Sequence, residues 1–299
     1  MISVVIPQYK GKEKLYTNLR HNLPFLDNCE IIVVNDYPDV PLTLEMKELF
    51  PKIKVIENKK NLGFAGAVRV GISQVKNNFI LLLNNDVLLN DKSFENALRY
   101  FKEDKMLFAV SFRQTEKDGR YVGRNKIYWE NGFFHHSKAD ATKRGINGWA
   151  EGGSMLFDKQ KYDSINGFDE LYSPFYWEDV DLSYRAWKAG YKILFNIDTT
   201  VEHHHESTIA TYFQSSRIKT IAYRNQFITI WKNISDRKLI IEHIIHLLKN
   251  LIVSLFKGDT PFIKGFWMAF LLLPKIISKR NNQKKAWRIR DIEIFDKFI

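Results

Sequence analysis

The sequence has a single cysteine, Cys29, among its 299 residues. One cysteine forms no internal disulfide, so nothing in the chain indicates an oxidising compartment. The first residues, MISVVIPQY, enter an apolar run directly, without the basic leader of a secretory signal peptide. We therefore expect a cytoplasmic protein.

Two common phosphate-binding motifs are also missing. A dinucleotide-binding fold needs G-x-G-x-x-G after its first strand, whereas this chain has Pro7-Gln8-Tyr9-Lys10-Gly11 there. No G-x-x-x-x-G-K-[ST] loop occurs either. If phosphates bind, another group must neutralise them. Mg²⁺ or a similar divalent cation suits that task, because such ions prefer oxygen ligands and often bridge a carboxylate to substrate phosphates.

The apolar stretches near the end of the chain do not predict a membrane-spanning helix. Gly265–Pro274 is unbroken, but its ten residues fall short of the roughly 20 that a bilayer requires. Leu239–Phe256 is apolar almost all round but is interrupted by two histidines and a lysine. Apolar helix faces that are bordered by basic residues are typical of helices that lie in the membrane interface. The alternative is a hairpin that packs on the main domain or on a second subunit.

The net charge of +11 lies entirely in the last third of the chain. Residues 1–206 balance 28 Lys and Arg against 28 Asp and Glu, while residues 207–299 hold 17 against 6. Such asymmetry favours a basic appendage that faces nucleic acid or anionic lipid, although a solvated, Lys-rich helical face is the alternative. The long apolar runs argue against nucleic acid. We predict two regions, 1–206 and a basic helical 207–299.

Short apolar runs alternate with amphipathic segments over the first 112 residues. This alternation predicts an α/β fold with a mostly parallel, Rossmann-like sheet flanked by helices, and ligands that bind beyond the carboxyl ends of the strands. The expected strands are Ile2–Ile6, Glu30–Val34, Ile53–Ile56, Phe79–Leu83 and Met106–Phe112, with helices near Leu15–Leu23, at Phe64–Val75 and at Phe94–Phe101.

The pattern after residue 112 is less regular. Gly152-Gly153 lies inside an expected strand, and glycine in a strand often marks the close approach of another backbone or a ligand. A helix is expected to end at Gly190, a good C-cap residue. The expected elements are irregular strands over 121–134, a loop over 137–146, strands at Trp149–Phe157, Lys192–Phe195 and Thr199–His203, and a helix at Glu178–Ala189.

Three of the expected strands end on a distinctive polar tip: Pro7-Gln8-Tyr9, Asn35-Asp36 and Asn84-Asn85-Asp86. If the strands are parallel, the tips meet at one edge of the sheet and form a candidate site. Asp86 supplies a carboxylate for a metal ion there. Taken alone, however, the same residue favours an Asx-type turn after a strand.

Two further groups carry possible chemistry. Glu178-Asp179 begins a helix, where acidic side chains are stabilised by the helix dipole, and Asp181 and Arg185 are spaced for an ion pair. A carboxylate at that position is also a candidate general base for an acceptor hydroxyl. His203-His204-His205 follows an apolar run, and three histidines at a strand end indicate metal or anion contact.

The order of these motifs resembles a known enzyme family. IPQYK, VVNDYP, NKKNLGFAGAVRVGI, LLLNNDV, GGSMLF, NGFDE and YWEDVDLSYRAWKAGY, followed by the histidines, are similar to glycosyltransferase family 2, the inverting enzymes of GT-A fold. The resemblance is greatest to bacterial rhamnosyltransferase-type members. It covers about residues 1–207 and is specific for fold and reaction class, but weak for the particular sugar.

The resemblance implies a site for a nucleoside-diphosphate sugar, UDP- or dTDP-linked. Tyr9, next to Pro7 and Gln8, matches the aromatic residue that stacks on the base. Asp36 matches the acidic residue that contacts the base. Asn61 and Gly63 match the donor-binding Asn-x-Gly. Arg69 stands where many relatives have Asn, and either contacts the donor diphosphate or forms a surface ion pair.

The resemblance also implies a metal site and a catalytic base. Asn84-Asn85-Asp86 occupies the place of the family's Asp-x-Asp, with Asn84 replacing the first carboxylate and Asp86 left to bind Mg²⁺ or Mn²⁺. His203 is the expected histidine ligand. Asp179, beside Glu178, matches the base that deprotonates the acceptor.

The expected acceptor is a glycan or a lipid-linked sugar. Glu151, Gly152, Gly153 and Trp177 are candidate contacts to the acceptor or the donor sugar. The basic tail is expected to hold the enzyme on the anionic inner face of the cell membrane, and an oligomer is possible. The alternative is a non-catalytic nucleotide-sugar-binding or scaffold protein on the same fold.

Overall fold

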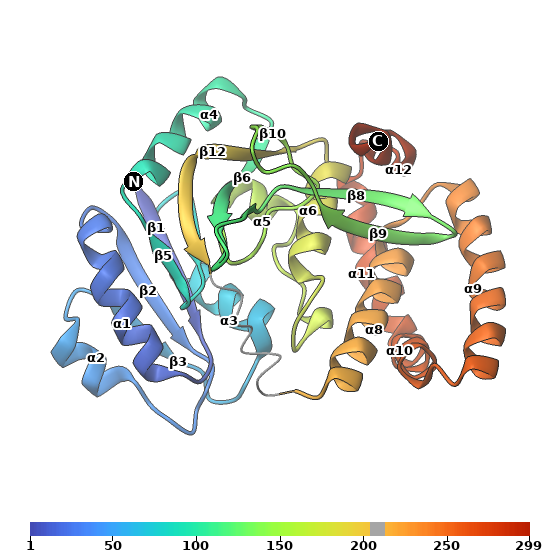
Figure 1. Ribbon diagram of the computed structural model, residues 1–299, viewed down its shortest axis with the longest axis horizontal. Helices are drawn as coiled ribbons and strands as arrows, with labels where there is room; N and C mark the ends of the chain where they lie inside the picture. The colour runs from blue at the N-terminus through green and yellow to red at the C-terminus, as the bar shows by residue number, and fades with distance from the viewer. Residues whose placement is uncertain (204–212) are drawn as a thin grey trace.

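Figure 1 shows a computed structural model of the chain, which describes residues 1–203 and 213–299. Its main feature is a ten-stranded mixed sheet with the order β10-β12-β6-β11-β4-β1-β2-β3, in which β5 pairs with β12 and β7 with β6. Strands β8 and β9 form a separate hairpin. The strands are β1 Ile2–Gln8, β2 Glu30–Asn35, β3 Lys54–Glu57, β4 Phe79–Leu83, β5 Val87–Leu89, β6 Leu107–Thr115, β7 Tyr121–Val122, β8 Asn125–Glu130, β9 Phe133–Lys138, β10 Gly145–Ile146, β11 Ser154–Asp158 and β12 Lys192–His203.

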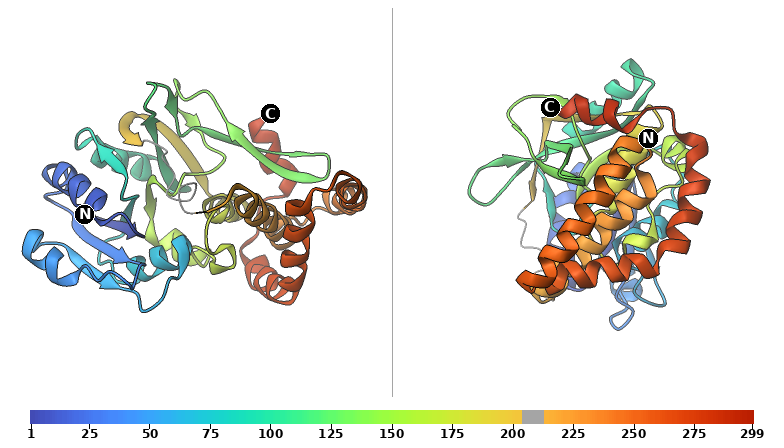
Figure 2. Two further views of the ribbon diagram at one scale, coloured as in Figure 1. Left: turned by 60° about the horizontal axis from the view of Figure 1, so that its bottom comes forward. Right: turned by 90° about the vertical axis from the view of Figure 1, so that its right-hand side faces the viewer.

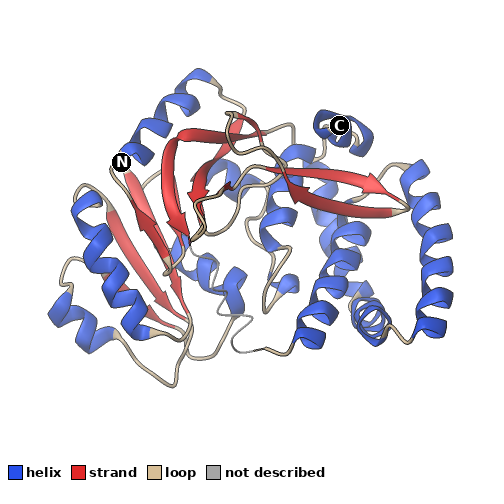
Figure 3. Ribbon diagram, viewed as in Figure 1, coloured by secondary structure: helices blue, strands red, loops and turns tan. Residues whose placement is uncertain are grey.

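Helices lie on both sides of the sheet (Figure 3). Successive side chains of a strand face opposite sides, so Val4 and Ile6 of β1 pack in one hydrophobic cluster with α1, while Val5 packs in another with α3. The helices are α1 Lys12–Asn22, α2 Thr43–Leu49, α3 Gly63–Ile72, α4 Leu98–Glu103, α5 Lys159–Ser164, α6 Glu178–Lys188, α8 Ser215–Asn233, α9 Arg237–Lys257, α10 Thr260–Leu271, α11 Leu273–Gln283 and α12 Asp291–Phe295.

The predicted α/β fold, a sheet flanked by helices with a C-terminal helical region, is confirmed, and the sheet itself is mixed. Strands β3, β2, β1 and β4 are parallel neighbours, and β6 is parallel to β12. β11 lies between β4 and β6 and is antiparallel to both. The carboxyl ends of β1, β2 and β4 therefore meet at one edge, as the polar tips predict.

Three local predictions were wrong. The two short strands expected at Lys192–Phe195 and Thr199–His203 form one strand, β12, with an irregularity between Asn196 and Thr200. Gly152-Gly153 precedes β11 in a turn rather than lying inside the strand. The loop expected over 137–146 contributes the end of β9 and all of β10 to strand pairing.

The C-terminal helices pack against the sheet domain. Phe227 of α8, Phe262 of α10 and Ile294 of α12 belong to the same hydrophobic cluster as Val5 and Leu82. Figure 2 shows α8 to α11 gathered at the end of the molecule away from β2 and β3. The boundary predicted between residues 206 and 207 falls outside the described residues.

One C-terminal helix has the length and composition of a membrane span. Helix α9 has 21 residues, and its most apolar 18-residue window has a mean hydropathy of 1.7 with only 17% of that window buried. Helices α10 and α11 satisfy the same criterion as a pair but are bent by 64° at their junction. Length and composition alone do not separate a helix that crosses a membrane from one that lies on it.

Candidate functional site

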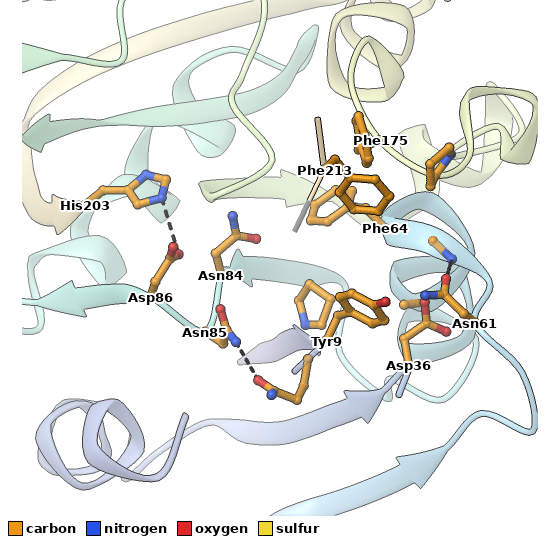
Figure 4. A pocket seen from close by; sticks show the side chains of 15 residues that line it. Tyr9, Asp36, Asn61, Phe64, Asn84, Asn85, Asp86, Phe175, His203 and Phe213 are labelled. Carbon is orange, nitrogen blue, oxygen red and sulfur yellow. Dashed lines mark hydrogen bonds and ion pairs between the residues drawn. The ribbon is translucent and has the colours of Figure 1, made fainter. Parts of the chain in front are cut away.

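A cavity of about 260 Å³ lies at the carboxyl ends of β1, β2 and β4. In Figure 4, Asp86, His203 and Asn84 lie on one side of it, Asp36 and Asn61 on the other, and Tyr9 between them. The three polar tips thus converge on one cavity. Its lining is Pro7, Gln8, Tyr9, Asp36, Asn61, Gly63, Phe64, Ala67, Asn84, Asn85, Asp86, Pro174, Phe175, His203 and Phe213.

The Asp36 side of the cavity is held by hydrogen bonds to the start of α3. The Asp36 carboxylate accepts from Asn58 Nδ2 at 2.8 Å and from the Leu62 amide at 2.9 and 3.1 Å. Burial raises the pKa of Asp36, although these hydrogen bonds act to lower it. Asn61 Oδ1 accepts from the Gly63 amide at 2.8 Å. Gly63 has φ +72°, and a Cβ there would lie 2.6 Å from Ser173 Oγ, so glycine is required at the entry to α3.

The Asn84-Asn85-Asp86 tip forms a turn between β4 and β5. The Asn84 carbonyl accepts from the Val87 amide at 3.2 Å, and Asn85 Nδ2 donates to Gln8 Oε1 at 2.5 Å. Backbone and Asn85 hydrogen bonds therefore hold this turn, and the Asp86 side chain faces the cavity.

Asp86 and His203 face each other across the cavity edge. Asp86 Oδ1 lies 3.3 Å from His203 Nε2, and both side chains are at most 10% exposed. Burial acts to raise the pKa of Asp86, but the His203 ring and the Lys14 ammonium outweigh burial and hold that pKa below its ordinary value. His204 and His205 lie outside the described residues.

The Asp86–His203 pair fits a divalent cation that is also bound by a substrate diphosphate. Asp86 Oδ1 is buried and accepts no hydrogen bond of normal geometry from the described residues, so it keeps a lone pair for an ion. Neighbouring ligands of an octahedral ion with bonds of about 2.1 Å lie about 3 Å apart. The described residues contain no cluster of three or more His, Cys, Asp or Glu that would hold an ion without substrate.

The two carboxyls at the start of α6 have different environments. Burial, followed by the charges of Asp179 and Asp181, raises the pKa of Glu178 well above its ordinary value. Burial raises the pKa of Asp179 to about 6. Hydrogen bonds from the Gly152 amide at 3.2 Å and the Val180 amide at 2.8 Å act in the opposite direction and lower it. Glu178 is thus held more strongly in its neutral form than Asp179, which makes Asp179 the better candidate of the two to take a proton.

Residues 151–153 lie between the cavity and Asp179 but do not line the cavity. A Cβ on Gly152 would lie 2.9 Å from the Phe64 ring, and a Cβ on Gly153 would lie 2.8 Å from His203 Cε1. The close approach that the glycines predict is present, although it is to side chains. Both Glu151 oxygens accept from amides, Gln114 Nε2 at 2.7 Å and Asn125 Nδ2 at 2.9 Å.

Two predicted site residues lie away from the cavity. Arg69 does not line the cavity. It donates to the Asn166 and Phe168 carbonyls and lies 3.5 Å from Glu170, which is the surface ion pair expected as one of its two roles. Trp177 is 9% exposed and packs edge-on against Phe134. One edge of Trp177 lines a separate cavity of about 280 Å³.

Sequence patterns did not reveal the aromatic wall of the cavity. Phe64, Phe175 and Phe213 come from three distant segments and stand together in Figure 4. Each has the spacing of an ordinary core residue. Pro174-Phe175, just before Glu178-Asp179, is the one local signal that points to the wall.

A family model described as glycosyl transferase family 2 matches residues 3–165, more than half of the chain. The chain belongs to glycosyl transferase family 2. A second model, described as the N-terminal domain of galactosyltransferase, matches residues 135–206. The family 2 resemblance that the motifs carry is confirmed.

Several curated glycosyltransferases are similar in sequence. The O-antigen chain rhamnosyltransferase RfbN of Salmonella typhimurium is 26% identical over 71% of this chain and 69% of its own. The poly(ribitol-phosphate) β-N-acetylglucosaminyltransferase TarP of Staphylococcus aureus is 28% identical over 48% and 45%. The match to an uncharacterised glycosyltransferase of Haemophilus influenzae, 24% identical, spans 47% of each chain. The chain thus spans about half the length of some curated relatives.

Solved structures show the fold. S. aureus TarS 1–349 in complex with UDP-GlcNAc superposes with a TM-score of 0.59 at 17% identity, covering 98% of this chain and 89% of that one. GalNAc-T7 with UDP, GalNAc and Mn²⁺ also has a TM-score of 0.59, at 14% identity, over 77% and 47%. The family 2 chain therefore has the predicted GT-A fold.

Proposed function

We propose that the protein is a metal-dependent inverting glycosyltransferase. It moves a sugar, with rhamnose among the candidates, from a UDP- or dTDP-linked donor to a hydroxyl of a glycan or lipid-linked acceptor in bacterial surface polysaccharide synthesis. One observation carries the proposal: the tips of β1, β2 and β4 bring Tyr9, Asp36 and Asp86 into one cavity, with His203 opposite Asp86. The similarity to the O-antigen chain rhamnosyltransferase RfbN and to the poly(ribitol-phosphate) β-N-acetylglucosaminyltransferase TarP supports the biosynthetic setting.

The proposed reaction is a single displacement. Asp179 accepts the proton of the acceptor hydroxyl, whose oxygen bonds to the anomeric carbon as the bond from that carbon to the diphosphate oxygen breaks. Attack from the face opposite the leaving group inverts the configuration. Asp86 and His203 would hold Mg²⁺ or Mn²⁺, which supplies charge that stabilises the leaving diphosphate. Tyr9 and Asp36 orient the nucleotide.

The acceptor side of the proposal rests on the surroundings of Asp179. Gly152 and Glu151 adjoin that carboxylate, and the cavity beside Trp177 is lined by His135, His136 and Tyr223. Aromatic rings with polar edges suit the stacking of sugar rings. The acceptor would approach Asp179 from this side, with the donor in the cavity lined by Phe64.

A screen of nucleotide sugars by thermal unfolding tests the proposal. One donor, in the presence of Mn²⁺, should stabilise the fold by about 2.7 kcal/mol at 100 times its Kd, because a ligand that binds only the folded state raises its stability. Excess EDTA should remove most of that shift, and Asp86→Asn should show little of it. The proposed donor site is wrong if no UDP-, dTDP- or GDP-sugar stabilises the protein under any metal condition.

Donor hydrolysis separates an enzyme from a nucleotide-sugar-binding scaffold. Slow release of sugar that depends on Mn²⁺ and on Asp86 would favour the enzyme. Binding without hydrolysis, and without transfer to any acceptor glycan in a cell extract, would favour the scaffold.

We further propose that α9 and α10 place the enzyme on the cytoplasmic face of an anionic membrane. Phe256 is 89% exposed and Leu271 78%, whereas soluble monomers rarely expose apolar patches larger than a few hundred Å². Lysines border this surface, including Lys249, Lys257 and Lys264. The exposed apolar side chains are Ile241, Ile244, Ile245, Leu248, Ile252, Val253, Leu255 and Phe256 of α9, and Trp267, Met268, Phe270 and Leu271 of α10.

The contacts of α9 favour a helix that lies on the membrane rather than one that crosses it. The Glu242 carboxylate accepts from Trp129 Nε1 at 3.0 Å and from the Gly132 amide at 3.1 Å. His243 Nδ1 contacts the Gly132 carbonyl at 2.8 Å. These bonds tie one face of α9 to the β8–β9 hairpin, and the opposite face is apolar, as in helices of the membrane interface.

Replacing two apolar side chains by serine tests the membrane surface. Phe256→Ser with Leu271→Ser should weaken binding to vesicles containing phosphatidylglycerol by at least about tenfold, because each large apolar side chain contributes roughly 1.5–3 kcal/mol when it is buried. Leu44→Ser, which changes a residue that is 87% exposed on α2, is the matched control. Unchanged vesicle binding, or a wild-type dimer that lipid does not disrupt, would show that a second copy covers this surface.

A further inference from the structure

A chain of hydrogen bonds stands behind the Asp86–His203 pair. Gln114 Nε2 donates to Glu151 Oε2 at 2.7 Å, and Gln114 Oε1 lies 2.8 Å from His203 Nδ1. Gln114 is in β6, next to the strand that ends at His203. It is completely buried and does not line the donor cavity, so it touches neither donor nor metal.

Glu151 fixes the orientation of the Gln114 amide. An ionised carboxylate only accepts hydrogen bonds, so the amide nitrogen must face Glu151 and the amide oxygen must face His203. Asn125 Nδ2 donates to the other oxygen of Glu151 at 2.9 Å, which holds that carboxylate in place. The amide oxygen therefore presents a fixed acceptor to the imidazole ring.

The fixed acceptor determines which ring nitrogen carries the proton. An amide oxygen accepts and never donates, so the His203 proton lies on Nδ1. Nε2 is then the ring atom that faces Asp86 Oδ1, 3.3 Å away. A positive charge between these two atoms holds them together, and either a proton on Nε2 or a metal ion that replaces this proton supplies it. Metal-binding histidines generally donate their second ring N–H to such a partner, which sets the orientation of the ring.

We propose that Gln114 is the positioning residue of the metal site: held by Glu151, its amide keeps His203 in the tautomer and orientation that offer Nε2, beside Asp86, to the cation. This inference rests on the proposed metal-dependent function. It also gives Glu151 a role through Gln114 rather than through contact with the sugar.

The test measures Mn²⁺ binding to the full chain by the EPR signal of free Mn²⁺, with Mn²⁺ alone and with Mn²⁺ plus UDP. Gln114→Met keeps the shape of the side chain but removes both hydrogen bonds. It should weaken Mn²⁺ binding by about 10- to 100-fold, the usual effect of removing a partner of a metal-binding histidine. Gln114→Asn retains the amide on a side chain that is too short to reach both partners, so it should show a similar loss. It replaces the Met variant in the test if that variant does not fold.

Asn233→Leu is the matched control. Asn233 is completely buried, and its amide donates to a buried carboxylate outside this chain of hydrogen bonds, Asp181 Oδ1, at 2.7 Å. Its loss should lower thermal stability and leave the Mn²⁺ affinity within about twofold. Equal Mn²⁺ affinities of wild type and Gln114→Met would overturn the inference about Gln114 without contradicting the proposed metal site. Equal losses in Gln114→Met and Asn233→Leu would show a general structural effect and also overturn the inference. No Mn²⁺ binding by wild type, with or without UDP, would instead overturn the proposed metal dependence.

Discussion

Asp179→Asn is expected to lower the rate of sugar transfer by about 10²–10⁴-fold, the usual contribution of a general base. Donor binding should change little, because Asp179 does not line the donor cavity. The substitution retains an oxygen for one of the two backbone amides, Gly152 and Val180, that bind the carboxylate. Steady-state kinetics with the donor found by the screen, together with its thermal shift, measure both effects.

The pH profile separates loss of the base from damage to the fold. Because the pKa of Asp179 is raised to about 6, transfer by wild type should fall about tenfold per pH unit below pH 6 and level off above it. A raised carboxyl pKa favours the folded state at low pH, and that stability is lost as pH rises through the folded pKa. Asp179→Asn should therefore match or exceed wild type in stability at pH 7. The base assignment is wrong if the variant keeps most of its turnover.

The second large effect is on stability. Lys232→Met is expected to lower the free energy of unfolding by about 3–5 kcal/mol, because it removes one partner of a buried ion-pair network. Lys232 Nζ lies 2.8 Å from both Asp169 Oδ2 and Asp181 Oδ1, and all three side chains are at most 3% exposed. Arg185 pairs with Asp181 as its spacing predicts. Lys249→Met, the same change at an exposed position of α9, should cost less than about 0.5 kcal/mol.

Urea titrations at two pH values test how the stability loss in Lys232→Met depends on pH. Burial acts to raise the pKa of Asp169, but Lys232 and Lys279 outweigh it and hold that pKa well below its usual range. A depressed carboxyl pKa stabilises the fold above the unfolded pKa of about 3.9, and this stability is lost as pH falls. The difference between wild type and Lys232→Met should therefore be larger at pH 7 than at pH 3.5. A loss below 1 kcal/mol at pH 7 would show that Arg185 and Lys279 suffice.

The parallel half of the fold was predictable because each buried run ends on an unusual polar tip. Asn84 to Asp86 could be placed beside Tyr9 and Asp36 from alternation alone, since parallel strands share one edge. The direction of β11 could not be predicted, because a short strand that is buried on both faces has the same pattern in either direction. The two roles expected for Arg69 stayed open for a related reason: periodicity puts it on α3 but does not say which end of the helix faces the cavity.

The His203 site illustrates a different limit. A histidine at a strand end indicates a metal, but its partner Gln114 lies 89 positions earlier and has no neighbouring motif. Likewise, the +11 charge of the last third predicts a separate basic appendage, while Lys232 and Arg224 of that region are buried. Charge counts do not distinguish lysines that face solvent from those that neutralise a carboxylate in the core.

The position of Lys232 also affects the order in which the chain matures during synthesis. Asp169 and Asp181 leave the ribosome before Lys232 and Lys279, which neutralise them together with Arg185. Until α8 and α11 are made, Arg185 is the one cation of this network at hand for the two carboxylates. The segment from Asp169 to Asp181, and with it the neighbouring pair Glu178-Asp179, should therefore reach its final packing late. We therefore expect a chain that ends near residue 206 to be degraded by proteases rather than to fold into a smaller active enzyme.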